Sequence, residues 1–175
     1  MGEGAKRTRG AVMAALIYHA RAGPGAAAPP GLQRSPGRPG ARYKRDMGGR
    51  KTVLVVDDSR AVVDALTAAF EEAGYAVASA LDGEEVFRKM AVTRPDALLL
   101  DVYMPKINGA DVCRLIKSHP HWKQTFLVIM SARITGRDVE TYRAMGADEV
   151  LKKPFDPAGA VALVERAVGG SGAGV

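Results

Sequence analysis

The stretch Asp96–Gly109, DALLLDVYMPKING, joins an uninterrupted apolar run to an acidic residue and then to a polar segment that contains proline and glycine. Similar apolar runs occur at Thr52–Asp57 (TVLVVD) and Thr125–Met130 (TFLVIM). Short continuous runs of this kind are typical of strands that are buried on both faces of a parallel sheet. We therefore interpret Asp96–Asp101 as a strand of such a sheet and expect Asp101 to lie at its carboxyl end.

Regular alternation extends outward from these three strands. Weaker runs at Tyr75–Ala80 and Asp148–Lys152 are interpreted as two further strands, of which the second is the weaker. Apolar residues at helical spacing follow each strand. They predict helices at Ala61–Ala73, Gly83–Val92, Asn108–Ser118, Arg137–Met145 and from Pro157 to about Val168. Five βα units in about 120 residues indicate an α/β fold with a parallel sheet, helices on both faces and right-handed crossovers.

Charge and composition divide the chain near residue 50. Residues 1–50 contain ten Lys and Arg residues against two acidic ones, a formal charge of +8, together with ten Gly and five Pro. Residues 51–175 contain fifteen basic and seventeen acidic residues, a formal charge of −2. A Gly and Pro share near one third without a period is typical of low-complexity or disordered sequence. We expect a basic tail over residues 1–50, a globular domain over residues 51–168 and a flexible Gly-rich tail over residues 169–175.

Three interpretations of the basic tail stay open. The apolar run Ala11–Tyr18, followed by Ala20-Arg21-Ala22, resembles a short secretory signal. The positive charge would suit an arm that binds nucleic acid or a membrane surface. The composition favours the third interpretation, a solvated extension without function, for which translation could also start at Met47.

Several classes of protein and site are excluded by single features. One cysteine, Cys113, rules out an internal disulfide framework and any zinc site built on cysteines, and we expect it to be an inert buried or half-buried thiol. Because spanning a bilayer takes about 20 apolar residues, the run Ala11–Tyr18 is too short to do so. His119 and His121 lie in a proline-containing loop with Trp122, and this pattern favours solvent-facing histidines over a metal site.

Polar residues gather where the expected strands end. In open α/β sheets ligands bind beyond the carboxyl ends of the strands. The side chains expected there are three carboxylates, a hydroxyl and an ammonium, from Asp57, Asp58, Asp101, Ser131 and Lys153. Three close carboxylates repel one another unless they share a cation, and the oxygen donors favour Mg²⁺. A carboxylate nucleophile beside Mg²⁺, Lys and Ser fits phosphoryl transfer to Asp101.

Each of these residues also has an ordinary structural interpretation. Asp57, Asp58 or Ser59 could cap a helix, and Asp101 could start the turn before Pro105. Lys153 could be a solvated charge and Ser131 a turn residue. The coincidence of all five groups at the same ends of the strands favours a functional cleft.

Four segments together resemble the receiver domain of two-component response regulators. They are VLVVDDS (Val53–Ser59), LLLDVYMPKINGADVCRLIK (Leu98–Lys117), VIMSA (Val128–Ala132) and GADEVLKKPF (Gly146–Phe155). The resemblance covers Lys51 to about Val168. It implies a flavodoxin-like, doubly wound (βα)5 fold with the strand order 2-1-3-4-5. The stand-alone type, similar to the chemotaxis response regulator, fits best, because only a few residues follow the last expected helix.

The resemblance also implies a role for each residue at the expected cleft. Asp101 matches the phosphoacceptor, and Lys153 and Ser131 match the residues that contact the phosphoryl group. Asp57 and Asp58 match the acidic pair that holds Mg²⁺, together with Asp101 and the backbone carbonyl of Tyr103. Pro154 matches a proline that follows a cis peptide bond. One position departs from the family, because Val150 stands where a switch Tyr or Phe is often found.

The function that the resemblance implies is signalling by phosphorylation rather than enzymatic turnover. The donor would be a histidine kinase or a His-containing phosphotransfer protein, and the domain would assist its own phosphorylation and dephosphorylation. We expect a cytoplasmic protein with no membrane span, no nucleic-acid contact by the domain, and a protein contact or onward phosphate relay as its output.

Three other classes of protein are disfavoured. An aspartyl-phosphate phosphatase or mutase would be expected to have a D-x-D motif at the end of the first strand. A non-phosphorylated interaction module would be expected to lack one of the five groups, and a transcription factor would need a DNA-binding segment after residue 168.

Overall fold

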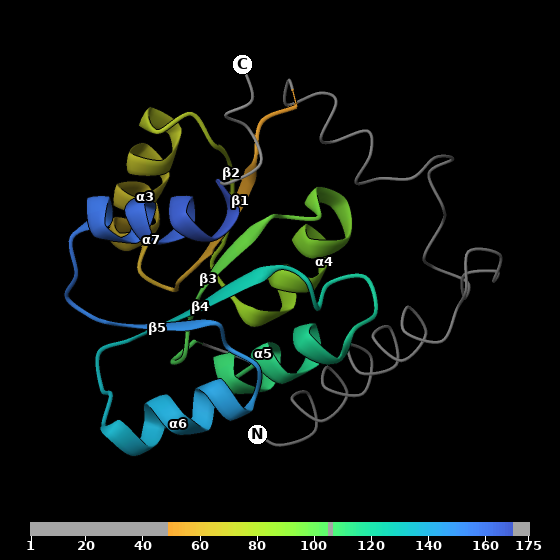
Figure 1. Cartoon of the computed structure of the whole chain (residues 1–175), viewed down its shortest axis with the longest axis vertical. Coiled ribbons are helices and arrows are strands. Elements are labelled where there is room, and N and C mark those ends of the chain that lie inside the picture. The colour runs from red at the N-terminus through yellow and green to blue at the C-terminus, as the bar shows by residue number, and fades with distance from the viewer. Residues whose placement is uncertain (1–48, 105–106, 170–175) are drawn as a thin grey trace, which may run out of the picture. The chain divides into compact units, whose positions relative to one another are not determined.

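The computed structural model describes residues 49–104 and 107–169, which form one five-stranded parallel sheet flanked by helices (Figure 1). The predictions made for residues 1–48 and 170–175 lie outside the described residues. The strands are β1 (Thr52–Val56), β2 (Ala76–Ala80), β3 (Ala97–Asp101), β4 (Phe126–Ser131) and β5 (Glu149–Lys152). The helices are α3 (Arg60–Glu72), α4 (Gly83–Thr93), α5 (Gly109–Ser118), α6 (Gly136–Ala144) and α7 (Pro157–Val168).

The order of the strands in the sheet is β2-β1-β3-β4-β5, and all four neighbouring pairs are parallel. This confirms the predicted α/β fold and the order 2-1-3-4-5. Strands β1 and β3 are buried along their whole length, as their continuous apolar sequences predict. Asp101 pairs with Met130 in the register of β3 and β4, so Asp101 lies beside the end of the neighbouring strand.

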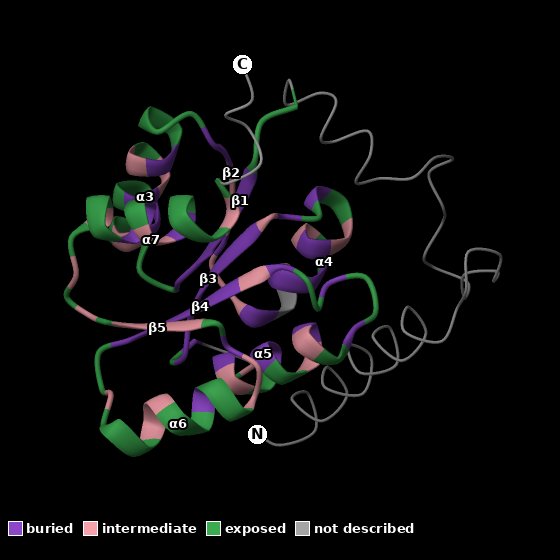
Figure 2. Cartoon of the chain, viewed as in Figure 1, coloured by how far each residue is buried: buried purple, intermediate pink, exposed green. Residues whose placement is uncertain are grey.

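Helices α3 and α7 cover one face of the sheet, and α4, α5 and α6 cover the other (Figure 1). Helices α3 and α7 pack on each other and share a core with alternate strand residues, including Val55, Leu99 and Val128. The intervening strand residues, such as Leu54 and Leu100, are fully buried on the side of α4 and α5. Figure 2 shows the strands as the buried centre of the domain and the outer faces of the helices as exposed.

Local signals set the ends of several helices. Gly74 and Gly146 adopt φ values of 87° and 101°, the left-handed region in which glycine ends a helix at little cost. Asp156 caps α7 by accepting a hydrogen bond from the Ala158 N–H (3.0 Å), with Pro157 in the first turn. Within the described residues, no helix has the length and apolar character that crossing a membrane requires.

Candidate functional site

Asp57 follows β1 directly and is completely buried. Its Oδ1 accepts a hydrogen bond from the backbone N–H of Ser59 (3.0 Å), the residue at the start of α3. Its Oδ2 accepts one from the Lys153 ammonium. The carboxylate is therefore fixed between the β1–α3 turn and a side chain that comes from the far end of the domain sequence. Asp58, next in the chain, is exposed.

Asp101 is the last residue of β3 and is 4% exposed. Its Oδ1 accepts a hydrogen bond from Lys153 Nζ (2.7 Å), and its Oδ2 accepts one from the backbone N–H of Tyr103 (2.8 Å). Gly109 allows α5 to begin against this strand end, because a Cβ there would lie 2.1 Å from the backbone oxygen of Asp101. The site thus includes a close backbone approach that only glycine permits.

Lys153 joins the two carboxylates from the end of β5. Its backbone N–H donates to the carbonyl of Ser131 (2.8 Å), which fixes the segment to β4. The Lys153–Pro154 peptide bond is cis, as the family resemblance implies. The side chain is 19% exposed and its ammonium donates to both Asp57 and Asp101. One cation therefore serves two buried carboxylates from different strands.

The charges at this site do not balance. Burial raises the pKa of the Asp101 carboxyl above its ordinary value, and the nearby charge of Asp57 raises it further, while Lys153 and the Tyr103 N–H lower it. Burial alone would lower the pKa of Lys153, but hydrogen bonds and charges from Asp101 and Asp57 outweigh burial and raise it. Two carboxylates and one ammonium leave a net negative charge, to which exposed Asp58 adds.

Ser131 lies at the end of β4 and is buried. Its hydroxyl donates to the backbone carbonyl of Arg133 (3.2 Å) and accepts from the Arg133 N–H (3.3 Å). The register of β3 and β4 places Ser131 one residue beyond the partner of Asp101. The hydroxyl thus lies at the carboxyl ends of the strands, as Asp101 does, and it hydrogen-bonds to the loop that follows β4.

The structure brings Asp57, Asp101 and Lys153 into contact, whereas the sequence alone predicted that three carboxylates converge. Asp58 and Tyr103 are exposed. Across residues 49–104 and 107–169, no three His, Cys, Asp or Glu side chains are grouped as a ready metal-ligand cluster. The donors that are present still fit Mg²⁺, because they are carboxylate oxygens with excess negative charge and without thiol or imidazole neighbours.

One expectation about the α5–β4 loop is wrong. His119 is 5% exposed rather than solvent-facing, because its ring stacks on Trp122 with 3.8 Å between ring centroids. Its Nδ1 also accepts a hydrogen bond from the backbone N–H of His121 (3.2 Å), and His121 is exposed as expected. Cys113 is fully buried, and burial raises the pKa of its thiol to about 11, as suits an unreactive cysteine.

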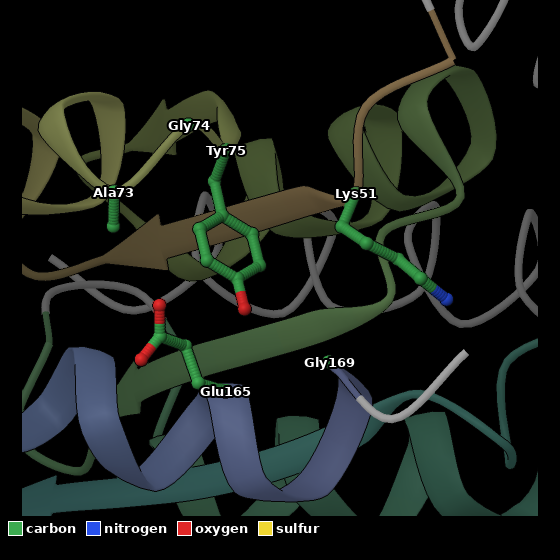
Figure 3. Close-up of a pocket in the computed structure, with 6 residues that line it drawn as sticks. All are labelled: Lys51, Ala73, Gly74, Tyr75, Glu165 and Gly169. Atoms are coloured by element: carbon green, nitrogen blue, oxygen red, sulfur yellow. The ribbon is translucent and has the colours of Figure 1, made fainter. Parts of the chain in front are cut away.

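Two hollows lie at opposite edges of the sheet. An apolar groove of about 440 Å³ borders the Lys153 site between α3 and the segment after β5. It is lined by Ala61, Val62, Ala65, Leu66, Ala132, Lys153, Pro154, Phe155 and Pro157. The other pocket, of about 340 Å³, is lined by Lys51, Ala73, Gly74, Tyr75, Glu165 and Gly169 (Figure 3). It contains none of the candidate site residues.

Sequence reasoning missed two features of the domain. The groove has no signal in the sequence, because it forms between segments about 90 residues apart. Tyr142 on α6 is buried, and its only sequence signal is that it is the one aromatic residue of that helix.

Comparison with known proteins identifies the family of this domain. A model of the response regulator receiver domain matches residues 53–165. The alkaline phosphatase synthesis transcriptional regulatory protein PhoP of Bacillus subtilis is 37% identical over 111 residues, which cover 61% of this chain and 44% of that protein. The response regulator MprA of Mycobacterium ulcerans is 42% identical over 107 residues, which cover 59% of this chain and 44% of that protein. The chain therefore spans less than half the length of these relatives.

Solved structures show the same fold. The chemotaxis response regulator CheY4 of Vibrio cholerae is 28% identical with a TM-score of 0.63, over 67% of this chain and 98% of that one. A putative response regulator from Chloroflexus aurantiacus is 32% identical with a TM-score of 0.64, over 69% of this chain and 98% of that one. The chain belongs to the response regulator receiver domain family.

Proposed function

We propose that Asp101 accepts a phosphoryl group from a phosphohistidine donor, and that residues 51–168 form the receiver domain that carries this chemistry. The donor would be a histidine kinase or a His-containing phosphotransfer protein. The contact of one ammonium, Lys153, with both Asp57 and Asp101 is the observation that carries the proposal. This contact places the cation that a transferring phosphoryl group needs beside a buried carboxylate at the end of a strand.

The reaction assigns a task to each residue of the site. A carboxylate oxygen of Asp101 attacks phosphorus, the phosphorus–nitrogen bond of the phosphohistidine breaks, and the leaving imidazole keeps the electron pair and takes up a proton. The product is an acyl phosphate on Asp101. Lys153 would pair with the phosphoryl oxygens instead of the carboxylate, and the Ser131 hydroxyl would turn from Arg133 to donate to them.

Mg²⁺ would be held by the carboxylates of Asp57, Asp58 and Asp101 and by the backbone carbonyl of Tyr103. Its fit rests on the uncompensated negative charge and on oxygen donors alone. When bound, the ion would neutralise charge on the phosphoryl oxygens during transfer. Asp57 would also hold Lys153 in place through their hydrogen bond, and the exposed Asp58 would contribute a further oxygen ligand.

Incubation of the full chain with acetyl phosphate and Mg²⁺ tests the phosphoacceptor. Intact mass should show one added phosphoryl group, and Asp101→Asn should show none, because the amide is not a nucleophile for this transfer. Asp111→Asn, which changes an exposed carboxylate on α5, is the matched control and should be phosphorylated at the wild-type rate. Equal phosphorylation of Asp101→Asn and wild type would show that Asp101 is not the acceptor.

Thermal unfolding with and without Mg²⁺ tests the metal ligands. Since an ion that binds only the folded state stabilises it by RT ln(1 + [L]/Kd), about 10 mM metal against a Kd of about 1 mM contributes about 1.4 kcal/mol. Asp58→Ala should abolish this stabilisation, and it should raise the melting temperature without metal because one repelling carboxylate is removed. Asp64→Ala, on the exposed face of α3, should keep the full Mg²⁺ response. Retention of the response in Asp58→Ala would remove Asp58 from the site.

The apolar groove beside Lys153 is the surface on which we propose that the donor docks. A donor must bring its phosphohistidine to Asp101, so its contact surface must border the site, and this groove shares Lys153 with it. Ala65→Glu, in the groove, should slow phosphotransfer from a histidine kinase that phosphorylates wild type, while leaving phosphorylation by acetyl phosphate unchanged. Ala68→Glu, on the exposed surface of the same helix outside the groove, should affect neither. Equal transfer to both variants would place the donor elsewhere.

The output that we propose is a changed protein–protein contact, or onward transfer of the phosphoryl group, in the cytoplasm. The proposal concerns the receiver domain only, since the Bacillus relative named as a transcriptional regulatory protein is more than twice the matched length. Phosphotransfer from a panel of histidine kinases would identify the donor and so the pathway.

A further inference from the structure

The pocket at the amino ends of the strands lies between the ends of two helices (Figure 3). Its volume of about 340 Å³ is at the small end of the range for sites that bind small molecules. Ala73 and Gly74 follow the last residue of α3, Gly169 follows the last residue of α7, and all three line the pocket. Because the carboxyl end of a helix carries a partial negative charge, two helices contribute such charge to this pocket.

Tyr75 brings a buried hydroxyl to the pocket. The residue directly precedes β2, is 6% exposed, and packs its ring edge-on against Phe70 with 5.5 Å between ring centroids. Figure 3 shows the hydroxyl directed away from the α3–β2 turn and toward α7. Among the described residues this hydroxyl has no hydrogen-bond partner. Since a buried hydroxyl without a partner is costly, a ligand that forms a hydrogen bond with it would gain stability there.

The charged groups that line the pocket favour a positive ligand. The carboxylate of Glu165 on α7 is directed toward Tyr75 (Figure 3), and among the described residues it has neither an ion-pair nor a hydrogen-bond partner. The ammonium of Lys51 is directed away from both groups and lies 3.6 Å from a carboxylate oxygen of Asp96. Burial raises the pKa of the Tyr75 phenol, and the charges of Glu165 and Asp96 raise it further, so the electrostatic potential at the hydroxyl is negative.

We propose that this pocket binds the ammonium group of a small primary amine. An ammonium has three donor hydrogens and no acceptor, and the pocket offers the acceptors that such a group needs. They are the carboxylate of Glu165, the hydroxyl oxygen of Tyr75 and backbone carbonyls at the ends of α3 and α7. The organic part of the amine would lie against the ring of Tyr75 and the side chain of Ala73. The pocket shares no residue with the Lys153 site, so the inference goes beyond the proposed function and does not depend on it.

Titration of the full chain with benzylamine at pH 7, followed through its amide signals by NMR, tests the site. Benzylamine should shift the signals of Gly74, Tyr75 and Gly169 in a saturable way. Benzyl alcohol and benzoate have similar size and shape but carry no charge and a negative charge. Each should bind at least about tenfold more weakly, the effect of losing one hydrogen bond between charged groups. No saturable binding of benzylamine, or equal binding of either analogue, would overturn the inference.

Substitutions identify the groups that hold the amine. Glu165→Gln changes an exposed side chain and should raise the Kd for benzylamine about tenfold, because the charged acceptor is lost. Tyr75→Phe keeps the ring and should raise the Kd about threefold, as expected for a neutral hydrogen bond. Lys51→Gln should bind benzylamine at least as tightly as wild type, because a positive charge beside the pocket is removed.

The matched control is Glu72→Gln, which removes an exposed carboxylate at the end of α3 that does not line the pocket. Its Kd should stay within about twofold of wild type, since an exposed charge outside the pocket is screened. Equal losses in Glu72→Gln and Glu165→Gln would mean that general negative charge attracts the amine, and would overturn the site. Wild-type affinity in Glu165→Gln, or weaker binding in Lys51→Gln, would overturn it as well.

Discussion

The amino ends of the parallel strands form one edge of the sheet, the amino edge, and their carboxyl ends form the other, the carboxyl edge. Each edge contains a lysine bound to aspartate, and the two arrangements differ in their charge balance. At the amino edge, Lys117 Nζ donates to Asp148 Oδ2 (2.5 Å) and to the Thr125 carbonyl (2.9 Å). Asp148 also accepts from the Leu127 N–H (2.7 Å). At the carboxyl edge, Lys153 alone serves Asp57 and Asp101. One edge pairs one cation with one anion, and the other pairs one cation with two.

This difference distinguishes a structural ion pair from a reactive site. The Lys117 pair connects α5, β4 and the segment before β5, and Asp148 is 37% exposed, so water shares in its solvation. The carboxylates at the Lys153 site are almost completely buried, and among the described residues no second cationic side chain pairs with them. A buried excess of negative charge is costly unless a further cation or a chemical change offsets it, which is why perturbed groups mark functional sites.

Removal of each lysine should give the largest difference between the edges. Lys153→Met leaves two buried carboxylates without a cation and should lower the free energy of unfolding by about 3–5 kcal/mol. Lys117→Met leaves a carboxylate that is partly solvated and keeps its backbone donor, so about 1–2 kcal/mol is expected. Urea unfolding at pH 7 without metal measures both. Similar losses in the two variants would contradict the contrast between the edges.

Mg²⁺ and a neighbouring lysine sharpen the same comparison. Added Mg²⁺ should restore part of the stability of Lys153→Met, because the ion can replace the missing positive charge, and should give no extra recovery to Lys117→Met. Lys152→Met changes an exposed lysine next in sequence and should stay within about 0.5 kcal/mol of wild type. A large loss in that variant would mean that charge near β5 matters in general, rather than the contacts of Lys153.

Glycines at the two edges should respond differently to an added methyl group. In Gly109→Ala the Cβ would lie 2.1 Å from the Asp101 carbonyl oxygen, a backbone atom that cannot move aside, so a loss of about 2–3 kcal/mol is expected. In Gly146→Ala the Cβ would lie 2.9 Å from Lys117 Cγ, a side chain that can adjust, and the positive φ costs about 1–2 kcal/mol. Gly136→Ala, with no atom within 4 Å of its Cβ, is the control and should be nearly neutral. A smaller loss at Gly109 than at Gly146 would contradict this ranking.

The sequence alone predicted the sheet and the pairing of distant residues at its carboxyl edge. Continuous β-branched and leucine-rich runs predicted β1 and β3, because strands of this composition are stable only when helices cover both faces of their sheet. Parallel strands share a carboxyl edge, so Asp57, Asp101 and Lys153 had to approach one another once the topology was correct. The parallel sheet follows from periodicity and chain direction, which are local properties of the sequence, whereas the strand order was implied by the family resemblance.

Features that depend on side-chain packing or on the direction of a turn were not predictable in this way. His119 is buried because Trp122 stacks on it, and a loop sequence carries no sign of that contact. Tyr142 lies in a short helix with little amphipathic pattern, so periodicity did not predict its burial. The exposure of Asp58 beside the completely buried Asp57 is set by the direction of the β1–α3 turn.

The smallest expected effect is a pH dependence that belongs to the carboxyl edge alone. Since burial raises the pKa of Asp101 in the folded state, the folded protein holds this proton more tightly than the unfolded chain does. Stability from this group should therefore fall as the pH rises from about 4, the ordinary Asp pKa, through the raised value, by about 1.4 kcal/mol for each unit of the shift. Asp101→Asn removes this loss, so its stability relative to metal-free wild type should increase with pH across that window and then level off. Gly136→Ala, which changes no titratable group, should show a constant difference from wild type. If the advantage of Asp101→Asn instead shrank as the pH rose, the ion pair with Lys153 would outweigh burial, and the charge at this edge would stabilise the fold as Lys117 and Asp148 do at the other.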